Sequence, residues 1–146
     1  MTRNEMIKDL GKYFKVSELV CDHTYAKWGE KSWQFLDIEL LNVLLVLRTK
    51  ILCRPLICNK KQAHQRGLRC NLCSLVKDKL SVYLSAHIFG MAIDFDVPGM
   101  PAEEVRQLII KSQNLLPCAI RLEADVSWVH LDVRNYTDQK IVLFKD

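Results

Sequence analysis

The chain has 146 residues, of which 49% are hydrophobic, 8% aromatic and 26% charged, an ordinary composition for a globular domain. This length suits one domain over residues 1–146 and excludes a second folded module within the chain. Lys and Arg number 21 against 17 Asp and Glu, and the net charge of +4 is too small to indicate a nucleic-acid partner by itself.

The first third of the chain is predicted to be mainly helical. Residues 1–20 are predicted to form a short helix and a turn, and the polar, aromatic residues 23–31 a loop. Apolar residues then recur at steps of three and four after Ser32, which is a plausible N-cap, and predict the longest helix over residues 33–50. This helix is apolar on more than one face, so we expect it to run through the centre of the domain.

The middle of the chain is predicted to be a short strand followed by a long connection. Residues 55–58 form a short apolar run and are predicted to be a buried strand, whereas residues 59–81 are polar and lack a clear period. Four basic residues gather there: Lys60, Lys61, Arg66 and Arg69. Because no known nucleic-acid-binding motif accompanies them, we interpret them as a solvated loop and expect no nucleic-acid partner.

The last third is predicted to combine strands with one helix. Residues 93–97 alternate as a strand does, and a helix is expected between Pro101 and Pro117. Three further strands are expected at residues 119–123, 128–133 and 141–144. The first two of these form a hairpin with a four-residue loop. The expected fold class is therefore α+β, a small antiparallel sheet with helices packed on it.

Targeting signals are not found. The first residues have neither an apolar core nor a small-residue cleavage site, and the longest apolar stretch, residues 40–47, is too short to span a bilayer. We therefore expect a chain made in the cytoplasm without a signal peptide and without membrane insertion.

The six cysteines are Cys21, Cys53, Cys58, Cys70, Cys73 and Cys118. Cys70 and Cys73 form a single C-x-x-C pair, whereas a structural zinc site usually needs a second pair or two histidines. A four-ligand site that adds the other cysteines, or Cys21 with the nearby His23, is an open alternative. Separate reduced thiols are the preferred interpretation.

Two histidine-containing segments can supply the ligands of a catalytic metal. Residues 85–94 contain His87 and Asp94, and residues 128–134 contain His130. Two imidazoles and a carboxylate are a sufficient set for a zinc enzyme, which needs three protein ligands and one open position. The spacing alone leaves open that each histidine is a structural residue.

These segments resemble a known signature. The pattern S-x-H-x-x-G-x-A-x-D at residues 85–94, followed by W-V-H-x-D at residues 128–132, is similar to the zinc-ligand motifs of the D-alanyl-D-alanine carboxypeptidase family. That family includes vancomycin-resistance dipeptidases and phage endolysins, and it shares its fold with the Hedgehog signalling domain. Upstream matches include the F-x-x-S-E-[FL]-x-C opening at residues 14–21, and the resemblance covers most of residues 14–134.

The resemblance implies a role for several residues. His87, Asp94 and His130 match the ligands of a Zn2+ cofactor. Arg69 matches an arginine that holds the substrate or steadies the transition state, although a surface ion pair is the alternative. Ser85 is expected to hold substrate or to shape its loop.

Two more residues near His130 keep two interpretations each. Asp132 is two residues after His130 and is therefore expected on the same face of the strand, where it can orient an imidazole or pair with Arg121. Trp128 can flank the substrate or cover an edge of the core, and the core is preferred.

The general base departs from the family pattern, because Ser127 occupies the position at which many relatives have an acid. Glu123 and Asp125 are the nearby candidates, and a site without a protein base of this type is the third alternative. A hairpin in which Glu123 lies opposite Trp128 would put Glu123 on the face of His130, and we prefer it. Asp125 would lie at the loop tip, where aspartate commonly forms turns.

The function implied by the resemblance is that of a zinc metallopeptidase acting on peptidoglycan stem peptides, of the phage endolysin or carboxypeptidase type. We expect a monomer that acts on the cell wall once released. A non-catalytic zinc-binding structural or binding protein on the same fold is the alternative, because fold does not settle function.

Overall fold

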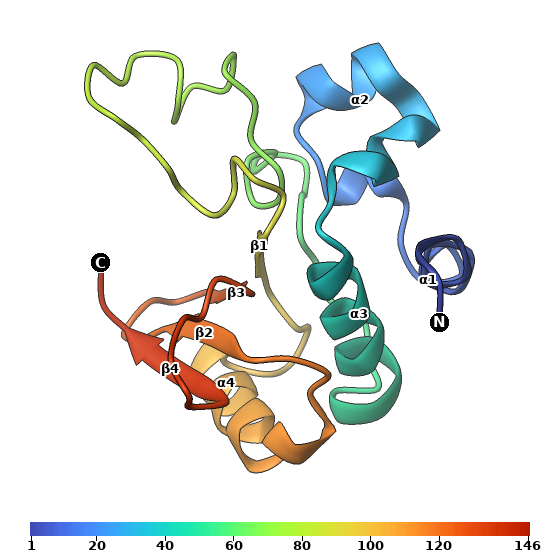
Figure 1. Cartoon of the computed structure of the whole chain (residues 1–146), viewed down its shortest axis with the longest axis vertical. Coiled ribbons are helices and arrows are strands. Elements are labelled where there is room, and N and C mark those ends of the chain that lie inside the picture. Colours follow the sequence, from blue (N-terminus) through green and yellow to red (C-terminus); the bar gives the residue numbers. More distant parts are fainter.

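The computed structural model describes all 146 residues and shows four α-helices and a four-stranded sheet (Figure 1). The helices are α1 (Arg3–Leu10), α2 (Asp22–Trp28), α3 (Ile38–Val46) and α4 (Ala102–Lys111). The strands are β1 (Ala92–Phe95), β2 (Ile120–Glu123), β3 (Val129–Asp132) and β4 (Ile141–Phe144). Three 3-10 segments (Val16–Glu18, Gly29–Phe35, Gln113–Leu115) and a π-helical turn (Leu47–Ile51) complete the helical structure. The α+β class is confirmed, and none of the helices has the length and apolar character that crossing a membrane requires.

The strand order in the sheet is β1-β3-β2-β4. Strand β3 pairs antiparallel with both β1 and β2, so the predicted hairpin is confirmed. Strand β4 pairs parallel with β2, and the prediction of a purely antiparallel sheet is therefore wrong. Strand β4 follows a turn after β3 and therefore runs opposite to β3. Both edges of β3 are occupied, by β1 and β2, so β4 joins the free edge of β2. Because β2 also runs opposite to β3, β2 and β4 are parallel.

The two faces of the sheet differ in character because successive side chains of a strand point to opposite faces. The core face carries Ile93, Phe95, Ile120, Leu122, Val129 and Leu131, all buried. The opposite face, here called the site face, carries Asp94, Arg121, Glu123, His130 and Asp132. The sheet thus separates the hydrophobic core from a polar surface.

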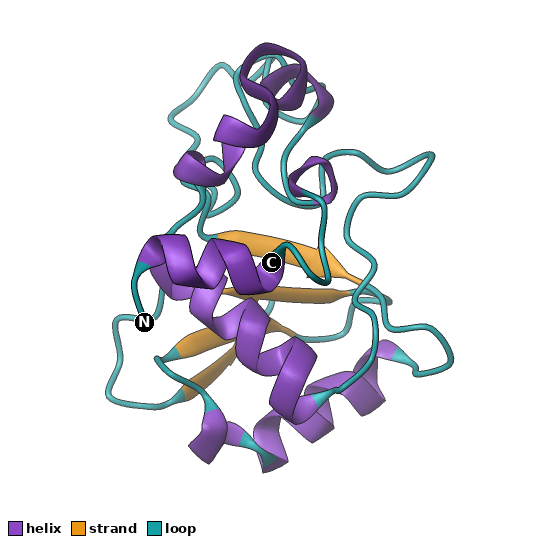
Figure 2. Cartoon of the chain, turned by 90° about the vertical axis from the view of Figure 1, so that its right-hand side faces the viewer, coloured by secondary structure: helices purple, strands orange, loops and turns teal.

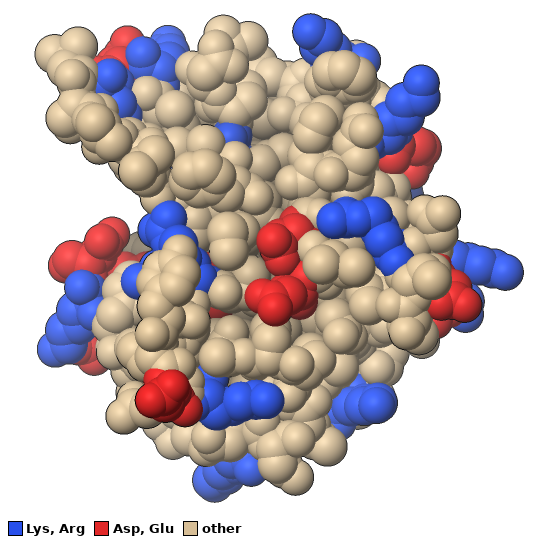
Figure 3. Space-filling model, in the orientation of Figure 1, with Lys and Arg blue, Asp and Glu red and all other residues tan.

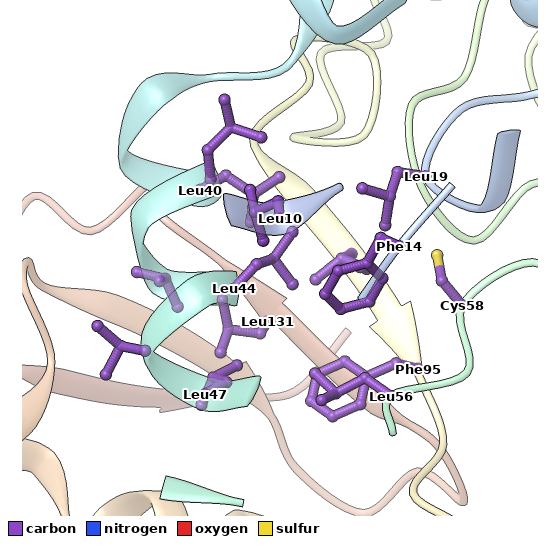
Figure 4. Close-up of a cluster of buried hydrophobic side chains, with 14 of the residues drawn as sticks. Leu10, Phe14, Leu19, Leu40, Leu44, Leu47, Leu56, Cys58, Phe95 and Leu131 are labelled. Atoms are coloured by element: carbon purple, nitrogen blue, oxygen red, sulfur yellow. The ribbon is translucent and has the colours of Figure 1, made fainter. Parts of the chain in front are cut away.

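Helices α1, α3 and α4 contribute to one hydrophobic cluster with the core face. Figure 4 shows Leu44 and Leu47 from the α3 region beside Leu131 of β3, with Phe95 of β1 close by. Figure 2 shows α1 and α3 lying across the sheet, in agreement with the expected central position of the apolar helix. Packing against this layer fixes the strands and hence the site face.

The predicted helix over residues 33–50 begins later than expected. The structure starts α3 at Ile38, with Asp37 as N-cap accepting a hydrogen bond from the Glu39 amide at 2.8 Å. Ser32 is therefore not the N-cap, and it lies in a 3-10 segment instead. The apolar period extends past the helix start because the 3-10 segment also buries Trp33.

Two other sequence predictions need correction. Residues 23–31, predicted to be a loop, contain most of α2, a short helix that buries only Thr24 and so lacks an apolar period. Residues 55–58 form only an isolated bridge between Ile57 and Asp96 rather than a strand. The connection over residues 59–81 is confirmed, since it contains turns and bridges but neither a helix nor a strand.

Gly90 holds the turn between the histidine segment and β1. Its φ is +66°, and an added Cβ would lie 2.1 Å from the Phe35 carbonyl oxygen. We expect Gly90→Ala to destabilise the protein by roughly 2–4 kcal/mol, from left-handed strain and a backbone clash together. Gly99→Ala is the matched control, because Gly99 also has a positive φ of 77° but open space around it. Urea unfolding of both variants tests this, and equal losses would contradict it.

Candidate metal centre

The three side chains predicted to ligate metal converge on the site face. The Nε2 atom of His87 lies 3.3 Å from Oδ2 of Asp94, and Nδ1 of His130 lies 2.7 Å from Oδ1 of Asp94. Asp94 and His130 are neighbours in the pairing of β1 with β3. His87 comes from the turn before β1, and all three side chains are buried.

Hydrogen bonds fix which nitrogen of each ring faces Asp94. Nδ1 of His87 donates to the Gly67 carbonyl at 2.8 Å, which leaves Nε2 directed at the carboxylate. Nε2 of His130 lies 2.9 Å from Asp132, which leaves Nδ1 directed at it. Outer hydrogen bonds of this kind orient metal-ligating imidazoles. Asp132 also accepts two hydrogen bonds from Arg121, at 2.9 and 2.8 Å, so both interpretations of Asp132 hold.

The residues fit a divalent metal. Their ligand atoms all lie within 4.8 Å of one another, and the distances from Asp94 to the two rings, 3.3 and 2.7 Å, lie near the separations of about 3–3.5 Å that zinc bonds of 2.0–2.2 Å produce. Two imidazoles and one carboxylate are the donors of hydrolytic zinc sites, and three protein ligands leave one position open. The group can therefore hold a catalytic metal ion.

Charges within the group are strongly coupled. Burial by itself would lower the pKa of His130, but hydrogen bonds to Asp132 and Asp94 outweigh it and raise the pKa to about 9. Burial likewise opposes ionisation of Asp94, yet its hydrogen bonds with His130 and His87 hold the pKa of this carboxyl well below its ordinary value. A metal ion would therefore replace a proton of the His130 ring, which lies between the carboxylates of Asp94 and Asp132.

In metal-free protein, the His130 ring is expected to lose its proton near pH 9 rather than near 6.5. Because the folded-state pKa is raised, the stability that this charge contributes is complete below pH 6.5 and is lost as pH rises through 9. An NMR titration of the ring measures the midpoint. Asp132→Asn should move the midpoint of the His130 titration down toward 6.5. An unchanged midpoint would show that Asp132 does not stabilise the protonated ring of His130.

A cavity of about 320 Å³ opens beside the three ligands and is lined by Arg69, Ser85, Glu123 and Trp128. The Arg69 guanidinium is largely buried, with Nη2 3.6 Å from Asp94 Oδ2, so it is not a surface ion pair. Ser85 Oγ accepts a hydrogen bond from the His87 amide at 3.3 Å and thereby shapes the loop. Trp128 is 37% exposed and lines the cavity, so its two interpretations, a side chain that flanks the substrate or one that covers an edge of the core, both remain predictions.

The two candidate bases are separated by the structure. Glu123 is buried at the cavity, and burial raises the pKa of its carboxyl, partly offset by the nearby His130. Asp125 is exposed at the loop tip, with a φ of 61° and an ion pair to Lys145 at 2.7 Å, and it does not line the cavity. Of the two, only Glu123 can exchange a proton with a group bound beside the ligands.

The register behind this preference was wrong by two residues. Arg121 lies opposite Asp132, whereas the predicted pairing of Glu123 with Trp128 would place Arg121 opposite His130. A shift of two leaves every side chain on its predicted face. The next position in the observed register places Glu123 directly opposite His130, whereas the predicted register placed it diagonally opposite.

Sequence reasoning missed two aromatic residues of the cavity. Tyr83 lies 3.4 Å from the Arg69 guanidinium through its hydroxyl. The Phe144 ring lies 5.6 Å from His130 and under Arg121. Strand alternation in β4 could have suggested Phe144 only if its partner strand had been known, whereas nothing in the polar loop marks Tyr83.

A second group of possible ligands lies outside this cavity. Cys21, His23, Cys70 and Cys73 bring their ligand atoms within 4.8 Å of one another. All six cysteines are free thiols, as expected, but Cys21, Cys70 and Cys73 lie together rather than apart, whereas Cys53 and Cys58 lie outside this group.

Comparison with protein-family models, with curated proteins and with solved structures gives no match to this chain. The resemblance to D-alanyl-D-alanine carboxypeptidases therefore rests on the motif residues alone.

Proposed function

We propose that the chain is a zinc-dependent peptidase that hydrolyses peptide bonds in peptidoglycan stem peptides, of the endolysin or carboxypeptidase type. The observation that carries this proposal is the convergence of His87, Asp94 and His130 with Glu123 on one wall of a cavity. Hydrolytic zinc sites combine such a three-ligand set with a carboxylate base. The substrate class follows from the resemblance of the motifs.

The shape and charge of the site suit a peptide with carboxylate groups. A second cleft of about 630 Å³ shares Arg69, Asp94 and Trp128 with the cavity, so an extended chain can lie across the ligands. Figure 3 shows this side of the molecule hollowed between the long loop and the strands. Arg69 and Arg134 line the cavity, and guanidinium groups bind carboxylates through paired hydrogen bonds.

When bound, zinc supplies a Lewis acid that activates water and polarises the peptide carbonyl. Glu123 takes the proton of the attacking water and passes it to the leaving amine, a role that its raised pKa favours. Arg69 donates hydrogen bonds to the oxyanion that forms on the carbonyl. Asp132 and the Gly67 carbonyl keep the two imidazoles in their ligating orientation.

Digestion of purified peptidoglycan by the zinc-loaded protein tests this function. We expect new free amino groups, and mass spectrometry of the released peptides identifies the bond that is cut. Folded, zinc-containing protein that releases no amines would contradict the proposal.

That negative result would favour a non-catalytic zinc-binding protein on the same fold. The observation behind this alternative is Ser127, an exposed serine where many members of the family have an acid. Glu123 weakens this alternative, because its carboxylate, on strand β2, lines the cavity and can act as the base that Ser127 cannot supply.

A further inference from the structure

The group formed by Cys21, His23, Cys70 and Cys73, which lies outside the cavity, has the composition of a metal site. Nδ1 of His23 lies 3.7 Å from Sγ of Cys70 and 3.9 Å from Sγ of Cys73. In a tetrahedral zinc site, bonds of about 2.3 Å to sulfur and 2.0–2.1 Å to nitrogen separate these atoms by about 3.6 Å. With Cys21, whose Sγ is within 4.8 Å of the others, the group offers three sulfurs and one nitrogen.

The backbone prepares this group independently of any metal. Leu68 pairs with Val20 in a parallel bridge, and the Cys21 amide donates to the Leu68 carbonyl at 2.9 Å. This bridge brings the start of α2 beside the C-x-x-C turn. The Leu72 amide donates to Sγ of Cys70 at 3.4 Å, which fixes the position of this sulfur in the turn.

We propose that Cys21, His23, Cys70 and Cys73 bind a second zinc ion, structural in role, in a closed Cys3His site. Four protein ligands leave no position for water or substrate, so this ion takes no part in hydrolysis. Cys21 and Cys73 are buried, Cys70 is half-buried and His23 is exposed, which gives the ion a path from solvent.

The second site would fasten the long loop beside the cavity. Arg69 directly precedes Cys70, and its amide donates to the His87 carbonyl at 3.1 Å. Residues 74–84 have no helix or strand and expose several apolar side chains, so few contacts of their own hold them in position. A zinc ion at residues 70–73 would hold the beginning of this segment and, with it, Arg69.

A disulfide between two of the three cysteines is the competing use of these thiols. It would consume two sulfurs and leave no four-ligand site. The two possibilities differ in metal content and in the number of free thiols.

Metal analysis and cobalt substitution of the full chain, purified with zinc and a thiol reductant, test the proposal. We expect two equivalents of zinc in the wild type and one in Cys70→Ser/Cys73→Ser. The cobalt-substituted wild type should show sulfur-to-cobalt charge-transfer absorption in the near ultraviolet. His87→Ala should lose one equivalent and keep that absorption, so failure of the catalytic site and failure of this site are distinguishable.

Cys53→Ser is the matched control, because Cys53 is exposed and outside the group, and it should keep both equivalents. If the double variant does not fold, His23→Ala removes one exposed ligand and should reduce the sulfur-to-cobalt absorption. Wild-type protein with no such absorption, or with a disulfide among these cysteines under the same conditions, overturns the proposal.

Discussion

Glu123→Gln is expected to reduce peptidoglycan hydrolysis by roughly 10²–10⁴-fold, the usual contribution of a positioned general base. Glutamine keeps the size of the side chain and its place on the site face, but it cannot accept and return a proton. The zinc content should be unchanged, because Glu123 is not among the three ligands. Initial rates of amine release at matched zinc content measure the effect.

Asp125→Asn is the matched control for this variant. Asp125 lies two residues away, is exposed and pairs with Lys145 rather than lining the cavity. Asparagine also tolerates its positive φ, so activity and stability should stay close to wild type. Full activity in Glu123→Gln, or a large loss in Asp125→Asn, would falsify the assignment of the base.

The site face was largely predictable from strand periodicity. Asp94, His130 and Glu123 fall on one face because each predicted strand alternates, and the face survives an error of two residues in register. A pairing error of one residue would have put Glu123 in the core instead. The alternation of side chains between the two faces was therefore the informative part of the pattern, and the exact pairing of residues across the strands was not needed.

Features that depend on distant contacts were not predictable. The direction of β4 depends on both edges of β3 being occupied, which no local pattern encodes. The cysteine group depends on the bridge between Val20 and Leu68, which joins segments almost fifty residues apart. Helix α2 escaped because its single buried residue, Thr24, gives no apolar period to recognise.

Ser32 illustrates a different failure. Its position before an apolar period resembles an N-cap, yet its hydroxyl is buried without a hydrogen-bond partner. The capping carboxylate five residues later, Asp37, was equally visible in the sequence. Apolar periodicity predicts that a helix is present more reliably than it predicts where the helix begins. The reason is that a 3-10 segment before the helix buries apolar residues with a similar spacing.

His87→Ala should remove the metal of the catalytic centre and lower hydrolysis by roughly 10³-fold or more, because the ion contributes several kcal/mol to transition-state stabilisation. The variant lacks the Nε2 ligand and loses the hydrogen bond to the Gly67 carbonyl. Chelation should inactivate the wild type to the same level. Added zinc should then restore the wild type but not the variant.

The matched control for this last comparison is His64→Ala. His64 is an exposed histidine that contacts Asp22 and the Lys61 carbonyl; it lines the second cleft but is not among the three ligands. Its loss should leave the zinc content unchanged. Because Glu123→Gln keeps the zinc equivalent of this centre and His87→Ala does not, the pair separates loss of the base from loss of the catalytic metal. Normal zinc content in His87→Ala would refute the ligand assignment, whatever its activity.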